Sequence, residues 1–486
     1  MSATTPRTDA ALGAFLDRAS AGVPSPPERI VHLGLGAFHR AHQAWYTAHA
    51  SNAGAWGIVA FTGRSRDLVD RMTPQQGLFT LVERGAERDR YEMVPSIVRV
   101  EAGDDVALFV RAVASPDVAI LTLTITEAGY RVDASGSLDQ SDPATKADIG
   151  LLRAAVAGSV ELAEATYPRT ALGRIVLALH ARRLARGGPI ALVSCDNLPD
   201  NGGVLRRALC DLVARISPDL LSWISESVSF VSTSVDRITP AIDTATESAA
   251  VAEATGWLDA APVVTEPFSD WVLSGDFPAG RPDWESAGAR FAEDLAPWES
   301  RKLWMLNGAH TVLAALGQAR GHTVVSAAID DHVCRRVVRA LWDDAARQLP
   351  MRDLSGYRVA LVQRFRNRRI EHRLAQIALD STTKMRLRVV PVALGELAAG
   401  RSADGCAAAI AAWMVGVGAG TVPHPAGVDV HGSGILDPQT LADLLDALDP
   451  RLSADAAFAA RVADAFGRLA ASRVSTSSST EGTGTP

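Results

Sequence analysis

Residues 31–40, VHLGLGAFHR, join an apolar run of strand character to a segment of helical character. Gly34 and Gly36 lie at the turn between them, where a dinucleotide site needs glycines so that the backbone can approach a pyrophosphate at a helix N-terminus. His39 occupies the place of a third glycine, so the fingerprint is incomplete. An ordinary tight turn is the alternative interpretation, and the preceding strand favours the dinucleotide site.

More strands of this kind follow along the first half of the chain. Short, nearly continuous apolar runs alternate with longer segments rich in Ala, Leu and Arg, which predicts a mainly parallel sheet covered by helices. The expected strands are residues 29–36, 56–63, 117–126, 188–195, 227–235 and 261–268. From Pro297 onward strand patterns become scarce and the spacing predicts helices. The fold class is therefore α/β with a mostly helical second half.

The sequence pattern predicts four segments, which are an N-terminal extension (1–27), a domain that contains the glycine turn and is expected to bind the dinucleotide (28–290), a helical domain expected to bind the substrate (291–472) and a tail (473–486). The polar, low-complexity tail is expected to be disordered. The extension lacks the basic flank and apolar core of a signal peptide. The uncharged run 406–420 is short and rich in Ala and Gly, which favours a buried helix over a membrane span. We therefore expect a soluble, cytoplasmic protein.

Charge and cysteine content disfavour several function classes. The net charge is −7 and no long Lys/Arg tract occurs, so nucleic acid is not an expected partner. The four cysteines have no CxxC spacing, which argues against a structural zinc site or a disulfide framework. The expected partner is a small molecule, and the chain is expected to act as a monomer or small homo-oligomer.

Polar residues follow three of the expected strands. Glu127 comes after the third, Asp196 and Asn197 after the fourth, and Asp236 after the fifth. Open parallel sheets bind ligands outside the carboxyl ends of their strands, which predicts one site beside all four residues.

The second strand bears on the choice of cofactor. An acid normally follows it and contacts the adenosine ribose, but here Arg64 and Arg66 come before any acid. An arginine in this place can hold a 2′-phosphate, while a solvated loop arginine is the alternative. The expected cofactor is NAD, and NADP stays open.

Residues 301–310, RKLWMLNGAH, place polar groups inside an apolar helical run. At roughly 100° per residue, Lys302, Asn307 and His310 share one helix face, and Glu299 lies within the same arc. An unpartnered buried polar group costs about 1–3 kcal/mol, so four together indicate water, a ligand or mutual pairing. The alternative is a snorkelling lysine, a capping asparagine and a satisfied core histidine.

Alcohol oxidation gives this set a chemical purpose. The hydroxyl proton must leave while hydride departs, and a lysine takes that proton only if it is neutral. Lowering its pKa by about 3 units corresponds to roughly 4 kcal/mol, which a partly desolvated cleft can supply. Asn307 can donate hydrogen bonds to the developing alkoxide, and His310 can hold the substrate oxygen. This scheme needs no metal.

Eight motifs in order along about 30–449 resemble the mannitol dehydrogenase family, the polyol-specific long-chain dehydrogenases and reductases. They are GLGAFHRAHQ (34–43), GLFTLVERG (77–85), TLTITEAGY (122–130), SCDNLPDNG (194–202), VDRITP (235–240), EPFSDWV (266–272), KLWMLNGAH (302–310) and QIALDSTTK (376–384). The resemblance implies a Rossmann-like, doubly wound N-terminal domain and a mostly α-helical C-terminal domain. It further implies metal-independent hydride transfer in the cleft between them.

The resemblance also implies roles for single residues. Lys302 matches the family's general base. Asn307 and Asn197 match the pair that holds the reacting oxygen, and His310 matches a substrate contact. Glu299 matches a glutamate associated with proton passage to solvent. The expected cofactor-binding residues are Gly34, Gly36, Phe38, Arg64, Glu127 and Asp236.

The segment QIALDSTTK, residues 376–384, bears on the substrate. It resembles the QIAxDGSxK of members acting on hexuronates, the fructuronate reductase branch, whereas mannitol 2-dehydrogenases typically carry RLCxDGSxR. Lys384 is the cation expected to meet a uronate carboxylate, and the arginine-rich run 364–373 is expected to be mostly a solvated face.

This chain departs from the family pattern in the substrate-facing domain. Ser381 replaces a glycine, Arg368 and Arg386 replace prolines, and WMVGVG (413–418) replaces a more polar segment that begins with arginine. The favoured reaction is D-fructuronate to D-mannonate. Fructose/mannitol, arabinitol and tagaturonate/altronate are the alternatives, and a catalytically inactive NAD(P)-binding sensor is an alternative of a different class.

Overall fold

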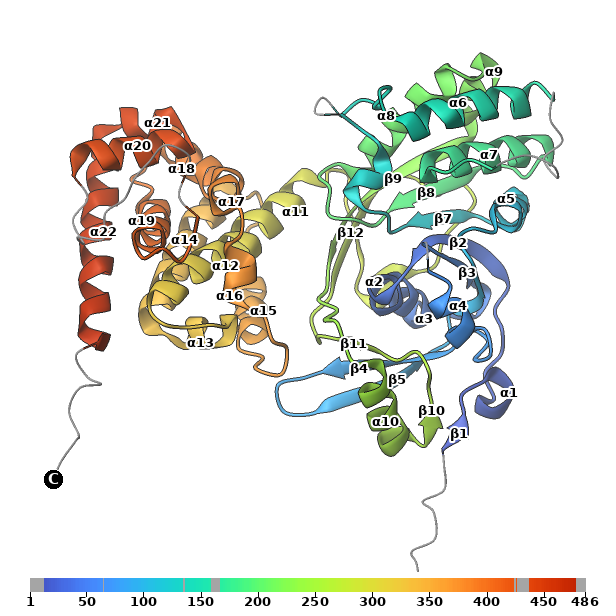
Figure 1. The fold of residues 1–486 in the computed structure, drawn as a ribbon, viewed down its shortest axis with the longest axis horizontal. Coiled ribbons are helices and arrows are strands. Elements are labelled where there is room, and N and C mark those ends of the chain that lie inside the picture. Colours follow the sequence, from blue (N-terminus) through green and yellow to red (C-terminus); the bar gives the residue numbers. More distant parts are fainter. Residues whose placement is uncertain are drawn as a thin grey trace, which may run out of the picture. The chain divides into compact units, whose positions relative to one another are not determined.

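The computed structural model describes residues 13–63, 65–133, 136–158, 167–423, 425 and 437–477. The chain divides into two compact units, Met1–Ala296 and Pro297–Pro486. Figure 1 shows a sheet with helices in the first and helices in the second. The predicted α/β class with a helical second half is thus confirmed.

The first unit is built around an eight-stranded sheet of order β13-β12-β9-β8-β7-β2-β3-β6. All neighbouring pairs from β9 to β6 are parallel, and β12 runs antiparallel to β9. The strands are β2 (Glu28–Leu35), β3 (Gly57–Thr62), β6 (Ile97–Glu101), β7 (Ile120–Leu123), β8 (Ile190–Ser194), β9 (Val228–Asp236), β12 (Asp270–Ser274) and β13 (Arg290–Phe291). The first five predicted strands therefore lie in one mainly parallel sheet.

Both faces of this sheet are buried, as its continuous apolar strands require. Val31 and Leu33 of β2 pack into one apolar cluster, while Ile30 and Leu35 pack into another on the opposite face. The helices of this unit are α1 (Arg18–Ala21), α2 (Ala37–His39), α3 (Trp45–His49), α4 (Asp67–Met72), α5 (Val106–Ala114), α6 (Pro143–Val156), α7 (Ala171–Leu184), α8 (Asn201–Ala214), α9 (Pro218–Ser227) and α10 (Thr244–Thr255).

The sixth predicted strand does not join the main sheet. β11 (Val263–Thr265) pairs with β4 (Phe79–Arg84), which forms a hairpin with β5 (Asp89–Val94). Neither strand of that hairpin is among the predicted strands. A short apolar run predicts a strand but does not say which sheet it joins, because pairing partners lie far away along the chain.

The described part of the N-terminal extension packs on the first unit. β1 (Ala14–Phe15) pairs with β10 (Trp257–Leu258). Arg18 is buried and its guanidinium donates to the carbonyl oxygens of Pro24, Pro95 and Ile97. Residues 1–12 lie outside the described residues.

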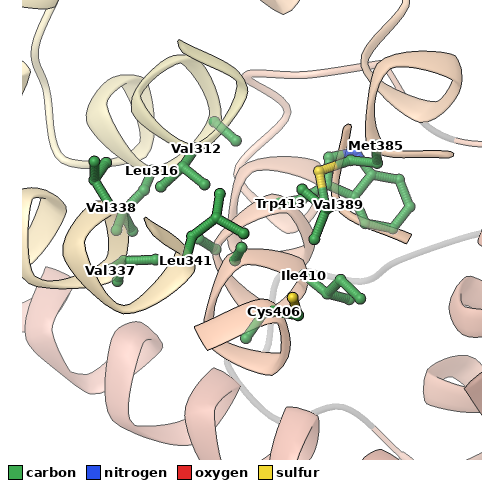
Figure 2. Packing of buried hydrophobic residues seen from close by; sticks show 14 of the residues in the cluster. Val312, Leu316, Val337, Val338, Leu341, Met385, Val389, Cys406, Ile410 and Trp413 are labelled. Carbon is green, nitrogen blue, oxygen red and sulfur yellow. The ribbon is translucent and has the colours of Figure 1, made fainter. Parts of the chain in front are cut away.

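The second unit consists of helices around one apolar core. They are α11 (Ala296–Arg301), α12 (Gly308–Val312), α13 (Val325–Asp330), α14 (His332–Gln348), α15 (Ser355–Phe365), α16 (Leu374–Ala378), α17 (Ser381–Arg388), α18 (Val390–Ala398), α19 (Asp404–Gly418), α20 (Pro438–Leu448), α21 (Pro450–Ala454) and α22 (Ala456–Ser477). Figure 2 shows Leu316, Leu341 of α14 and Ile410 of α19 among the side chains of that core.

The uncharged run 406–420 is mostly α19, which is buried, as predicted. Within the described ranges, no helix is long and apolar enough to cross a membrane. Helix α22 continues to Ser477, beyond the expected domain limit at 472, and residues 478–486 lie outside the described part of the chain.

Candidate functional site

The glycine turn is shaped by its first glycine. Gly34 has a φ of +112°, a conformation that side chains rarely adopt, and an added Cβ would overlap the carbonyl oxygen of Thr124. The Thr124 hydroxyl donates to the Gly34 carbonyl over 2.7 Å. Gly34 therefore lets the end of β2 lie directly against the end of β7.

Gly36 meets a different requirement. It is the N-cap residue of α2, its backbone is extended, and no side chain caps the helix there. An added Cβ would meet nothing closer than the Gly34 carbonyl oxygen at 3.8 Å. The protein itself leaves this space open in front of a helix N-terminus, which fits the close approach of a dinucleotide pyrophosphate. Phe38, in the same turn, is half-buried and stacks on His42 at 5.0 Å.

His39, in the place of the third glycine, packs by stacking. Its ring lies 3.3 Å from the ring of His32 in β2, at an interplanar angle of 11°. Both rings are fully buried, and burial lowers the pKa of His32 to about 3 and that of His39 well below the ordinary value. Two neutral imidazoles thus replace the close helix–strand contact that a glycine would permit.

Strand order brings the other predicted residues of the first unit to one edge. β9, β8, β7 and β2 are consecutive neighbours in the sheet. Asp236 ends β9 and is buried, while Asn197 follows β8 and Glu127 follows β7, both with exposed side chains. The carboxyl ends of these strands therefore lie side by side next to the glycine turn.

Asn197 lies along the chain between Asp196 and Asn201, and each of these two residues makes several hydrogen bonds. The Tyr130 hydroxyl donates to the Asp196 carboxylate, which also accepts from the Leu198 N–H over 2.9 Å. The buried Asn201 amide donates to the carbonyl oxygens of Asp196 (3.1 Å) and Thr233 (3.0 Å). Tyr130 and Asn201 are not among the predicted site residues, although they lie in the family motifs 122–130 and 194–202.

The end of the second strand gives no test of the cofactor prediction. Arg64 lies outside the described residues. Arg66 pairs with Asp104 over 2.9 Å, and both side chains are exposed.

In the second unit, the segment that carries the predicted catalytic residues is not a regular α-helix. Residues Lys302–Asn307 form a π-helical turn between α11 and α12, in which the Gly308 N–H donates to the carbonyl oxygen of Leu303. Because a π-turn is wider than an α-turn, the 100° spacing used to place Lys302 and Asn307 on one face does not apply here. Glu299 lies in α11 and His310 in α12.

His310 is buried in an aromatic environment. Its ring lies 4.8 Å from the rings of both Phe365 and His372. Burial is the main cause that lowers the pKa of His310 well below its ordinary value, and His372, Arg364 and Arg388 lower it further. The imidazole is therefore neutral at physiological pH. It can donate one hydrogen bond from one ring nitrogen and accept one at the other.

Lys384 lies in α17 and is half-buried. Its ammonium donates to the Ile377 carbonyl oxygen over 2.9 Å. Burial lowers the pKa of Lys384, and Arg388 one turn later acts in the same direction. In the arginine-rich run, Arg366 and Arg368 pair with Asp330, and Arg373 pairs with Glu371.

Two departures from the family pattern contact each other. Ser381, the first residue of α17, is buried and its hydroxyl accepts from the indole N–H of Trp413 in α19 over 3.1 Å. Among the described residues, no group of three or more His, Cys, Asp or Glu side chains could hold a metal ion.

Comparison with known proteins covers most of the chain. It matches the mannitol dehydrogenase Rossmann domain over residues 28–286 and the mannitol dehydrogenase C-terminal domain over residues 294–419. It is 36% identical over 437 residues to D-mannonate oxidoreductase of Escherichia coli (strain K12), covering 87% of this chain and 83% of that protein. It is 33% identical over 401 residues to a mannitol 2-dehydrogenase of Cereibacter sphaeroides, covering 79% and 80%.

A solved structure is similar over nearly the full length. The ternary complex of Pseudomonas fluorescens mannitol 2-dehydrogenase with NAD and D-mannitol aligns with a TM-score of 0.70 at 30% identity, and the alignment covers 97% of this chain and 98% of that one.

Proposed function

Because this chain belongs to the mannitol dehydrogenase family and is thereby an oxidoreductase of CH–OH groups, we propose that it interconverts D-fructuronate and D-mannonate with NAD as cofactor. The observation that carries the substrate assignment is the segment 376–384, whose sequence resembles that of hexuronate-specific members and which supplies the cation Lys384. The 36% identity to a D-mannonate oxidoreductase supports the same choice. A partly desolvated ammonium binds a carboxylate more strongly than a neutral hydroxyl.

A nicotinamide cofactor, when bound, accepts or delivers the hydride. The open N-terminus at Gly36 and the close packing at Gly34 support binding of its pyrophosphate. We assign Phe38, Glu127 and Asp236 to the same cofactor site. Arg64 belongs to this proposal as the residue that would meet a 2′-phosphate if NADP is used.

The proposed chemistry at the substrate begins with a proton. Lys302 acts as general base on the hydroxyl of the alcohol, and in reduction its ammonium returns a proton to the carbonyl oxygen. The side-chain amides of Asn307 and Asn197 donate hydrogen bonds to that oxygen and stabilise negative charge on it.

The two remaining residues of the proposed site bind the substrate or pass protons to solvent. His310, held neutral by burial, donates one N–H to a substrate oxygen without adding charge to the site. Glu299 lies in the helical turn before Lys302 and passes the proton of Lys302 to and from solvent. Every step assigned here uses a side chain of this protein and needs no metal ligand.

A panel assay tests this proposal. Oxidation of NADH and NADPH is followed at 340 nm with D-fructuronate, D-tagaturonate, D-fructose and xylulose. We expect D-fructuronate with NADH to give the highest kcat/KM. A preference for D-fructose would assign the chain to mannitol oxidation instead, and turnover of none of these compounds would favour a cofactor-binding sensor.

A further inference from the structure

The π-helical turn Lys302–Asn307 is held by donors from other helices. The carbonyl oxygen of Met305 accepts from the indole N–H of Trp342 in α14 over 2.8 Å, in the buried core. A π-turn is rare and intrinsically less favourable than an α-turn, so it persists where surrounding contacts stabilise it. The indole of Trp342 is one such contact.

Arg388 supplies a second contact at the end of the same turn. Its Nη1 donates to the Asn307 main-chain carbonyl over 3.2 Å and to the Thr311 hydroxyl over 3.0 Å. The Thr311 hydroxyl in turn donates to the Asn307 carbonyl over 3.0 Å. One guanidinium thus fixes both the last residue of the π-turn and the residue one turn beyond it.

Arg388 is also the last residue of α17, which begins in the segment proposed to bind substrate. Lys384 and Arg388 are four residues apart and lie on the same face of that helix. Burial lowers the pKa of Arg388 to about 10, so its guanidinium stays charged at neutral pH. The helix that carries Lys384 is therefore hydrogen-bonded to the backbone of Asn307 through the half-buried guanidinium of Arg388.

We propose that Arg388 is a positioning residue. By donating a hydrogen bond to the main-chain carbonyl oxygen of Asn307, it fixes the position of the Asn307 side-chain amide relative to the Lys384 ammonium. The proposal rests on the proposed function for the roles of Asn307 and Lys384, whereas the hydrogen bond from Arg388 to the π-turn does not depend on that function. Arg388 touches neither reacting atom in this assignment. It acts by fixing where Asn307 lies.

The test compares Arg388→Met with the matched control Arg386→Met. Arg386 lies on the same helix, but its side chain is exposed and donates to the Ala447 carbonyl. Arg388→Met should lower kcat with D-fructuronate and NADH roughly ten- to a hundred-fold, the scale on which a misplacement of about 1 Å slows catalysis. The dissociation constant of NADH should change by less than about twofold. Arg386→Met should leave both unchanged.

Hydrogen–deuterium exchange of residues 302–312 gives a readout that does not depend on activity. Exchange should be faster in Arg388→Met than in the parent or in Arg386→Met, because the π-turn loses an external donor. If the parent reduces no compound of the panel, the proposed function fails, and this exchange measurement alone decides whether Arg388 holds the turn.

Two milder variants keep the proposal testable if Arg388→Met does not fold. Arg388→Lys keeps the charge but offers one nitrogen, and Thr311→Val removes one of the two acceptors. Both variants should show a smaller fall in kcat than Arg388→Met, and both should show faster exchange than the parent. Parental kcat and parental exchange in Arg388→Met, or in both milder variants, would overturn the proposal.

Discussion

Gly34 and Gly36 lie two residues apart in the same turn, yet they are glycines for different reasons. At Gly34 both the positive φ and the contact with Thr124 come from the protein itself. At Gly36 the backbone is extended and the space around the Cα is open. Stability depends on the first glycine, and we assign ligand binding to the second.

This difference gives a paired prediction. Gly34→Ala should lower the free energy of unfolding by about 1–3 kcal/mol or more, because alanine is strained at that φ and overlaps the Thr124 carbonyl. Gly36→Ala should change it by less than about 0.5 kcal/mol while weakening NADH binding. Urea unfolding and NADH fluorescence titration measure the two effects. Equal loss of stability in both variants would contradict this division.

Lys302 is the residue on which the proposed chemistry depends most. Lys302→Ala should lower kcat by roughly 10²- to 10⁴-fold or more, the usual contribution of a general base, with little change in NADH affinity. Lys146→Ala, at an exposed lysine of α6, serves as the control and should keep parental activity. Near-parental turnover in Lys302→Ala would refute the assignment of the base.

Among the helices of the second unit, the N-terminus of α17 is hydrogen-bonded to α19. The indole N–H of Trp413 is buried and its acceptor is the Ser381 hydroxyl. In the sequence these two residues are separate departures from the family pattern. Their hydrogen bond makes them one structural feature, and it fixes the start of the helix that carries Lys384.

A double-mutant cycle tests that coupling. Ser381→Ala should lower the free energy of unfolding by about 1–3 kcal/mol, because it leaves the Trp413 N–H buried without an acceptor. Once Trp413→Phe has removed that N–H, the further change Ser381→Ala should cost less, with a coupling energy of about 0.5–3 kcal/mol. Strictly additive losses in urea unfolding would show that the two side chains do not interact.

In both units of the protein, burial of histidines links stability to pH. Burial depresses the pKa of His32, His39 and His310 in the folded chain, whereas in the unfolded chain each titrates near about 6.5. The stabilising effect is complete above that pH. As the pH falls below it, the unfolded chain binds protons that the folded chain excludes, so the folded state loses stability.

We therefore expect the free energy of unfolding to fall between pH 6.5 and 5 by up to about 1.4 kcal/mol per pH unit for each of these histidines. Urea unfolding at pH 7, 6 and 5 measures the slope. His39→Phe keeps an aromatic ring against His32 but cannot bind a proton, so its slope should be smaller. An unchanged slope in that variant would exclude His39 as a contributor.

The strands and glycines whose signal is local can be predicted from the order of amino acids alone. β2, β3, β7, β8 and β9 are apolar along their length because both sheet faces are covered, and that pattern needs no knowledge of the neighbours. The order of motifs likewise identified the family, and the helical spacing after Pro297 predicted the second unit.

Which distant residues meet becomes evident only in the folded chain. β11 pairs with the hairpin of β4 and β5 instead of the main sheet, and Lys302–Asn307 form a π-turn where the sequence predicted a regular helix. The donors that hold this turn, Trp342 and Arg388, come from helices far along the chain. Periodicity reports how one segment is buried, whereas these features depend on contacts between segments, which no local pattern encodes.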